Sequence, residues 1–68
     1  MDAVDRLAKN ARMIRRSRGL SQEEVAFRAG LKRSYLSDLE RGVRNPTVRA
    51  LGRIATALDV HPARLLED

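Results

Sequence analysis

Apolar residues recur at intervals of three and four along most of the chain, and no stretch alternates between apolar and polar as a β-strand would. The clearest stripe lies in residues 3–17 and consists of Val4, Leu7, Ala8, Ala11 and Ile14. That spacing puts one face of a helix against a core, and Gly19 provides a left-handed cap after it. Glycine and proline divide the remainder into four shorter helical segments, so the sequence predicts a compact all-α fold of five helices.

Two short helices are expected on either side of Gly30. Ser21 is a good N-cap for the earlier one, and Glu24 three residues later is expected to complete a capping box. The later helix spans about residues 32–41 and ends at Gly42. The pattern therefore predicts a helical pair joined by a glycine turn.

The last third of the chain is expected to contain two helices. Thr47, directly after Pro46, caps the first, and Asp59 ends it because aspartate tolerates a left-handed turn. The final helix is short, with His61 near the cap and Pro62 in the first turn. The core stripe of the longer helix is expected to be Val48, Leu51, Ile54, Ala55 and Leu58.

The helix over residues 32–41 has two chemically different sides. With residues placed at 100° intervals, one side is apolar and the other carries guanidinium and hydroxyl groups. Such groups donate hydrogen bonds to phosphates and base edges, which favours DNA binding, although a solvated helix face has the same composition. The apolar side contains Tyr35, Leu36 and Leu39, and the opposite side contains Arg33, Ser34, Ser37 and Arg41.

Small residues before this helix favour the DNA interpretation. Ala26 and Ala29 allow the two helices to approach closely, and Gly30 allows a sharp turn without a Cβ penalty. An ordinary helical hairpin needs no such spacing, whereas a helix-turn-helix does. We therefore expect a helix-turn-helix over about residues 21–42.

Size and charge are compatible with a small DNA-binding protein. The 68 residues are expected to form a single domain, residues 1–68. Fourteen Lys and Arg face nine Asp and Glu, and the net charge of +5 favours a polyanionic partner. Most of the basic residues are arginine, which suits phosphate and guanine, although a GC-rich genome produces the same bias. Without cysteine, a membrane-length apolar run or a signal-peptide pattern, a cytoplasmic protein is expected.

Catalysis is not expected from this composition. One histidine and no cysteine leave few nucleophiles or bases, and the adjacent Glu23 and Glu24 point about 100° apart instead of converging. His61 with Glu67 and Asp68 is a poor set for a metal. Attachment of the basic first helix to a membrane surface is disfavoured, because no aromatic residue lies on that helix. We expect no catalytic residue, metal, cofactor or small-molecule ligand.

Residues 21–41 resemble the helix-turn-helix of the phage repressor and Cro superfamily, the XRE-type regulators. The matching residues are Ser21, Gln22, Ala26, Gly30, Leu36, Leu39 and Glu40. The flanking segments RMIRRSRGLSQEEVA and NPTVRALGRIATALDV also resemble the family. Within it, RSYLSDLERGVRNPT is most similar to the controller proteins of restriction–modification systems. The resemblance implies a lambda-repressor-like DNA-binding domain.

The resemblance also implies roles for single residues. Gln22 would bind a phosphate at a helix N-terminus, and Arg33 would read guanine. Tyr35 would either lie near the DNA backbone or pack in the core. Lys32 departs from the family, which usually has a capping Ser, Thr or Asp there. The DNA-binding residues expected are Gln22, Lys32, Arg33, Ser34, Tyr35, Ser37, Arg41, Arg44 and Asn45.

A buried ion pair is expected between the first and third helices. Arg15 lies on the apolar side of its helix, where an unpaired guanidinium would be very costly, and Glu40 lies near the apolar side of the third helix. The family has a similar pair. Val60, Leu65 and Leu66 are candidates for a dimer surface, although at least one of the leucines must close the monomer core.

These observations predict a transcriptional regulator that binds a palindromic operator in double-stranded DNA as a homodimer. The alternative is an antitoxin-type module that binds a partner protein, and nothing in the sequence excludes it. The sequence specifies neither the operator, nor activation versus repression, nor the regulated genes.

Overall fold

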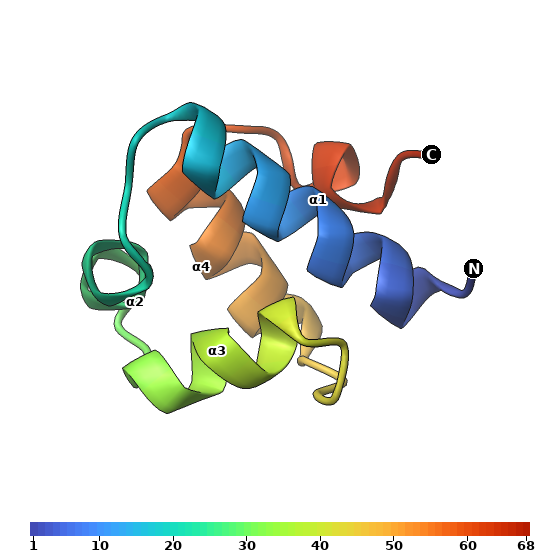
Figure 1. The fold of residues 1–68 in the computed structure, drawn as a ribbon, viewed down its shortest axis with the longest axis horizontal. Coiled ribbons are helices and arrows are strands. Elements are labelled where there is room, and N and C mark those ends of the chain that lie inside the picture. Colours follow the sequence, from blue (N-terminus) through green and yellow to red (C-terminus); the bar gives the residue numbers. More distant parts are fainter.

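A computed structural model describes all 68 residues as four α-helices followed by a short 3-10 helix (Figure 1). The elements are α1 (Ala3–Ser17), α2 (Gln22–Ala29), α3 (Arg33–Glu40), α4 (Val48–Leu58) and η1 (Pro62–Leu66). The predicted all-α fold is confirmed, but its fifth helix is a 3-10 helix. A segment of five residues is too short to repay the nucleation of an α-helix, and its backbone bond from Arg64 N to His61 O has i to i+3 spacing.

The helix ends follow the capping chemistry of the sequence, with one difference. The Ser21 hydroxyl accepts a hydrogen bond from the backbone N–H of Glu24 at 3.0 Å, and Thr47 caps α4 in the same way. The Glu24 side chain accepts a hydrogen bond from Arg28 at 2.6 Å instead of bonding back to the cap. The capping box is therefore only half formed, because an ion pair one turn away occupies the carboxylate.

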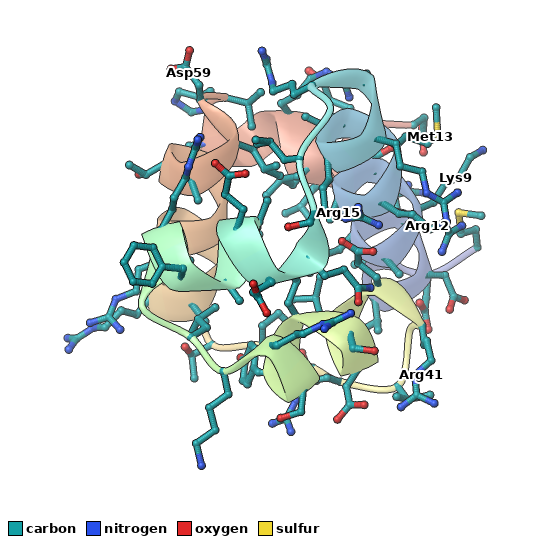
Figure 2. The ribbon with its side chains drawn as sticks, turned by 60° about the vertical axis from the view of Figure 1, so that its left-hand side comes forward. Lys9, Arg12, Met13, Arg15, Arg41 and Asp59 are labelled. Carbon is teal, nitrogen blue, oxygen red and sulfur yellow. The ribbon has the colours of Figure 1, made fainter.

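The two sides of α1 have different environments. Figure 2 shows Lys9 and Met13 projecting outward from α1, whereas Arg15 lies between α1 and the start of α2. Met13 is exposed, while Ala11 and Ile14 on the inner side are buried. The helix therefore contributes both an apolar stripe and one inward-facing cation to the interior.

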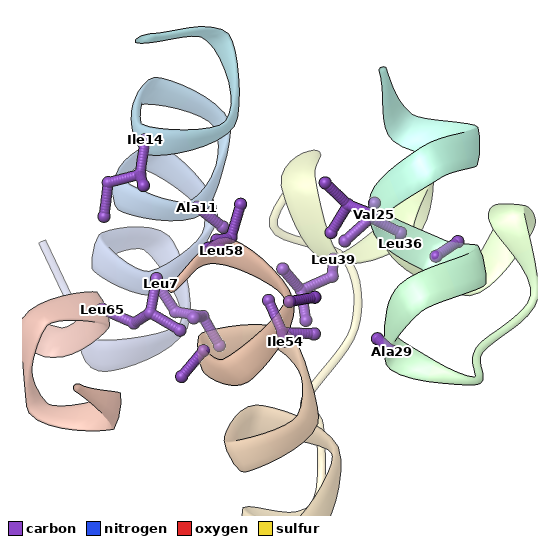
Figure 3. Close-up of a cluster of buried hydrophobic side chains, with 13 residues drawn as sticks. Leu7, Ala11, Ile14, Val25, Ala29, Leu36, Leu39, Ile54, Leu58 and Leu65 are labelled. Carbon is purple, nitrogen blue, oxygen red and sulfur yellow. The ribbon is translucent and has the colours of Figure 1, made fainter. Parts of the chain in front are cut away.

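A single hydrophobic core joins all five elements (Figure 3). Leu39 and Ile54 lie near its centre, between the side chains of α1 and those of α2. Ile54 and Leu65 have no exposed surface at all. This packing holds the apolar side of α3 against the rest of the domain, because Leu36 and Leu39 are its buried hydrophobic residues.

Val48 does not belong to the core, contrary to the sequence prediction. It is the first residue of α4 and is 85% exposed. Its side chain leaves the helix about 120° from Ile54, at one edge of the apolar side, whereas Ala50 and Ala57 toward the other edge are buried. The core side of α4 is thus lined partly by alanines, which allow close approach of the neighbouring elements.

The C-terminal segment is fastened to α1 by a buried asparagine. Asn10 Nδ2 donates hydrogen bonds to the carbonyl oxygens of Leu65 at 3.0 Å and Glu67 at 2.7 Å. An ion pair of 2.7 Å between Arg6 and Asp68 lies at the same end of the molecule. These contacts fix η1 beside α1, so the last residues complete the core.

Candidate nucleic-acid interface

The turn between α2 and α3 has the geometry of a helix-turn-helix. Gly30 ends α2 in the left-handed region, with φ of 70°. The N–H of Leu31 donates to the carbonyl oxygen of Ala26 at 2.9 Å, which closes the turn, and α3 begins at Arg33. A side chain at φ of 70° would be strained, so the glycine sets the direction in which α3 leaves.

The outward side of α3 begins with two free cations. Lys32 and Arg33 are both exposed, and neither forms an ion pair. Ser34 is exposed beside them, and Ser37 one turn later is half-buried. Lys32 stands at the N-cap position but has no acceptor for a helix N–H group, and its ammonium group forms no ion pair within the protein. This end of α3 can donate several hydrogen bonds to an anion or a base edge.

The C-terminal end of α3 and the following loop share one carboxylate. Asp38 pairs with Arg41 on its own helix and lies 3.6 Å from an Nη atom of Arg44. The Cζ atom of Arg44 is 4.3 Å from the centre of the Tyr35 ring, a cation–π contact. Tyr35 is half-buried and packs against the core while holding Arg44 above it. Asp38 was not among the expected DNA-binding residues, and the fold brings it close to Arg44 in the following loop.

Glu40 organises a second set of contacts at the junction of α1, α2 and α3. Its carboxylate accepts two hydrogen bonds from Arg15, at 2.7 and 3.0 Å, so the structure contains the expected ion pair. The same carboxylate accepts a hydrogen bond from Gln22 Nε2 at 3.1 Å. Arg12 of α1 donates to the backbone oxygen of Glu40 at 2.8 Å. The contacts made by Gln22 and Arg12 were not found from the sequence.

The hydrogen bond from Gln22 to Glu40 leaves Gln22 able to bind a phosphate, the role expected from the sequence. The amide nitrogen carries two protons, and only one is used by Glu40. The second proton stays available at the N-terminus of α2, where the helix dipole favours an anion. Gln22 is therefore held in a fixed orientation by the same carboxylate that pairs with Arg15.

The structure gathers the expected DNA-binding residues on a short stretch of the fold. Gln22 lies at the start of α2, and the remaining eight lie in residues 32–45, on α3 or beside it. Asn45 is exposed in the loop that follows α3. Four of these residues are cations, Lys32, Arg33, Arg41 and Arg44, and one acid, Asp38, lies among them. We refer to this set, Gln22, Lys32, Arg33, Ser34, Tyr35, Ser37, Arg41, Arg44 and Asn45, as the α3 surface.

The candidate dimer residues have different environments. Leu65 is fully buried in the monomer core, so its side chain is not available to a second copy. Leu66 is 41% exposed, and Val60 is half-buried against the core. Of the two leucines, Leu65 is therefore the one that closes the monomer core, because η1 packs that residue against α1.

No group of three or more His, Cys, Asp and Glu side chains could hold a metal ion. None of the helices combines the length and apolar character that crossing a membrane requires.

Comparison with known proteins identifies the family. Residues 12–65 match the helix-turn-helix family HTH_3, and the chain belongs to that family. The resemblance predicted from residues 21–41 is thereby confirmed.

Its relatives include regulators of restriction–modification systems. The uncharacterized HTH-type transcriptional regulator y4dJ of Sinorhizobium fredii is 47% identical over 66 residues, which cover 97% of this chain and 86% of the relative. The control protein C.BamHI of Bacillus amyloliquefaciens is 43% identical over 60 residues, 87% of this chain and 74% of that protein. The crystal structure of the restriction–modification controller protein C.AhdI from Aeromonas hydrophila superposes with a TM-score of 0.88, covering 91% of this chain and 94% of that one. The two sequences are 42% identical.

Proposed function

We propose that this chain is a transcriptional regulator that binds a palindromic DNA operator as a homodimer, in the manner of a restriction–modification controller protein. The observation that carries the proposal is the exposed start of α3, where Lys32 and Arg33 have no ion-pair partner. The net charge of +5 and the similarity to control proteins support it. We propose that residues 1–68 act as one DNA-binding unit, without catalytic activity, in the cytoplasm.

In this proposal α3 enters the major groove with its exposed side. Arg33 reads guanine through bidentate hydrogen bonds to O6 and N7, and Ser34 and Ser37 contact neighbouring bases or phosphates. Gln22 binds a phosphate with its free amide proton, and Glu40 keeps the amide in place. The backbone contacts fix the position of the helix, and Arg33 supplies the sequence information.

The arginines at the far end of α3 contribute phosphate contacts. Arg41 and Arg44 are paired with Asp38 in the free protein. A phosphate would replace that carboxylate as a partner, and Asp38 would then accept from cytosine N4 or repel a misplaced backbone. Tyr35 holds Arg44 in position through the ring contact of 4.3 Å.

Dimerisation supplies the contacts that one small domain lacks. A homodimer presents two copies of α3 to successive turns of the major groove, about 34 Å apart. We propose that Leu66, with Val60 beside the core, lies in the dimer contact, because Leu66 is an exposed leucine next to the buried Leu65. No observation in the structure favours an antitoxin role over this one.

Selection of binding sites from random duplexes tests the proposal. The expected result is an inverted repeat whose half-sites are centred one helical turn apart, about 10–10.5 base pairs or a multiple of it. A parallel selection with Arg33→Ala should lose one guanine preference in each half-site and keep the symmetry. Absence of any enriched sequence with the wild-type protein would contradict the proposal.

A further inference from the structure

A second surface of the molecule carries an aromatic residue and two free arginines. A shallow groove runs between the end of α2 and the outward side of α4 and reaches the start of η1. Phe27 lies at its edge and is 84% exposed, although it is the only phenylalanine in the chain. None of the residues of the α3 surface lines this groove. A phenylalanine left in water gains free energy when another apolar group covers it, so the groove is suited to a partner.

The charges of the groove all have one sign. Arg49 and Arg53 lie one turn apart on α4, are exposed, and form no ion pair. Like charges at this spacing weaken a helix slightly, so the fold gains nothing from them. Arg28 also lines the groove but is paired with Glu24 at 2.6 Å. No acidic residue lines the groove, so two guanidinium groups remain for carboxylates from outside.

The floor of the groove includes a glycine that packing does not require. Gly52 lies within α4, where glycine is an unfavourable helix residue. A Cβ atom placed on it would meet no other atom within 4 Å, so no neighbouring element needs the space. The missing side chain leaves the floor open between Arg49 and Arg53, and a bound chain could approach the backbone of α4 there.

We propose that this groove binds an acidic segment of another protein, with an aliphatic or aromatic side chain against Phe27 and carboxylates on Arg49 and Arg53. A DNA backbone offers the arginines phosphates but gives Phe27 no apolar group to cover it. A second copy of this chain is also unsuitable, because a two-fold contact through the groove would bring arginines together without an acid among its lining residues. The groove lies beside the α3 surface and not within it, so the proposal does not depend on DNA binding.

A peptide titration followed by NMR tests the proposal. The probe is a synthetic twelve-residue peptide in which Asp and Glu alternate with Leu, and the control peptide has Asn and Gln in place of the acids. The amide signals of Phe27, Gly52 and Arg53 should shift with the acidic peptide, and the control peptide should bind about tenfold or more weakly. Phe27→Ala should weaken binding several-fold while the protein stays folded, because its side chain is exposed.

Two arginine variants distinguish binding in the groove from general charge attraction to the protein. Arg53→Ala should weaken binding of the acidic peptide. Arg16→Ala, which removes an exposed and unpaired arginine from α1, should leave that binding unchanged. Equal losses in both variants, or shifts confined to the α3 surface, would overturn the proposal. It would also be overturned if Phe27→Ala lowered the affinity for a duplex selected with the wild-type protein, or changed the oligomeric state in sedimentation. The first result would assign the groove to DNA, and the second to a contact between copies.

Discussion

Removal of the Arg15 side chain should destabilise the domain far more than removal of any exposed arginine. Arg15 donates two hydrogen bonds to the Glu40 carboxylate, at 2.7 and 3.0 Å, and a third to the backbone oxygen of Leu20 at 2.9 Å. The Glu40 side chain is 3% exposed. In Arg15→Ala this carboxylate keeps only the hydrogen bond from Gln22, and water reaches it poorly.

The size of the effect follows from that geometry. Removing one partner of a buried ion pair costs about 3–5 kcal/mol, because the other charge is left uncompensated. At 0.05–0.15 kcal/mol per residue, a domain of 68 residues has a total stability of about 3–10 kcal/mol. Arg15→Ala should therefore remove a large share of the stability and leave part of the population unfolded at 25 °C.

Urea unfolding followed by circular dichroism at 222 nm measures the loss. Arg16→Ala is the matched control, since Arg16 is exposed and unpaired, and it should change the stability by no more than about 0.5 kcal/mol. The double variant Arg15→Met with Glu40→Leu should recover most of the loss, because it removes the stranded charge. The reasoning fails if Arg15→Ala costs less than about 1 kcal/mol, or if the double variant is no better than the single one.

Three further predictions concern the backbone, the dimer and the DNA contacts. Gly52→Ala should raise the free energy of unfolding, measured in urea, by about 0.5–1 kcal/mol, because Gly52 has an open helical position. Gly42→Ala should lower the free energy of unfolding, because Gly42 has φ of 77°. Equal effects of the two substitutions would show that backbone conformation does not determine their effect on stability. Leu66→Glu should shift sedimentation equilibrium toward the monomer without unfolding the protein, and an unchanged dimer would place the contact elsewhere. Arg33→Ala should cost about 1–3 kcal/mol on the selected duplex alone, whereas Arg44→Ala should weaken selected and random duplexes alike and reduce the salt slope by about one. Fluorescence anisotropy at several salt concentrations distinguishes these two patterns.

Much of the fold follows from rules that act within one helix. Apolar spacing located the helices, and side-chain caps at Ser21 and Thr47 located their starts. The partner of Arg15 could also be anticipated, because a cation on an apolar stripe needs an acid on a facing stripe, and Glu40 was placed near one. Each of these inferences requires only the helical repeat and the cost of burying a charge.

The sequence could not predict contacts for which one side chain has several possible partners, or burial that depends on where an element lies in the fold. Glu24 could bond to the Ser21 cap or to Arg28, and only the structure shows that it pairs with Arg28. Val48 has the right spacing for the core stripe but lies at the first turn of α4, beyond the neighbouring elements. The contacts of Gln22 with Glu40 join residues on different helices, and no spacing rule along the chain predicts them.

The central claim is that the exposed side of α3 reads a DNA sequence. The most direct test compares the affinities of the wild-type protein for a selected duplex and for a scrambled duplex of the same base composition, by fluorescence anisotropy at one fixed salt concentration. We expect the selected duplex to bind about a thousandfold or more tightly, as for specific DNA-binding proteins in general. Equal affinities for the two duplexes would mean that the α3 surface binds only the phosphate backbone, and would contradict the claim.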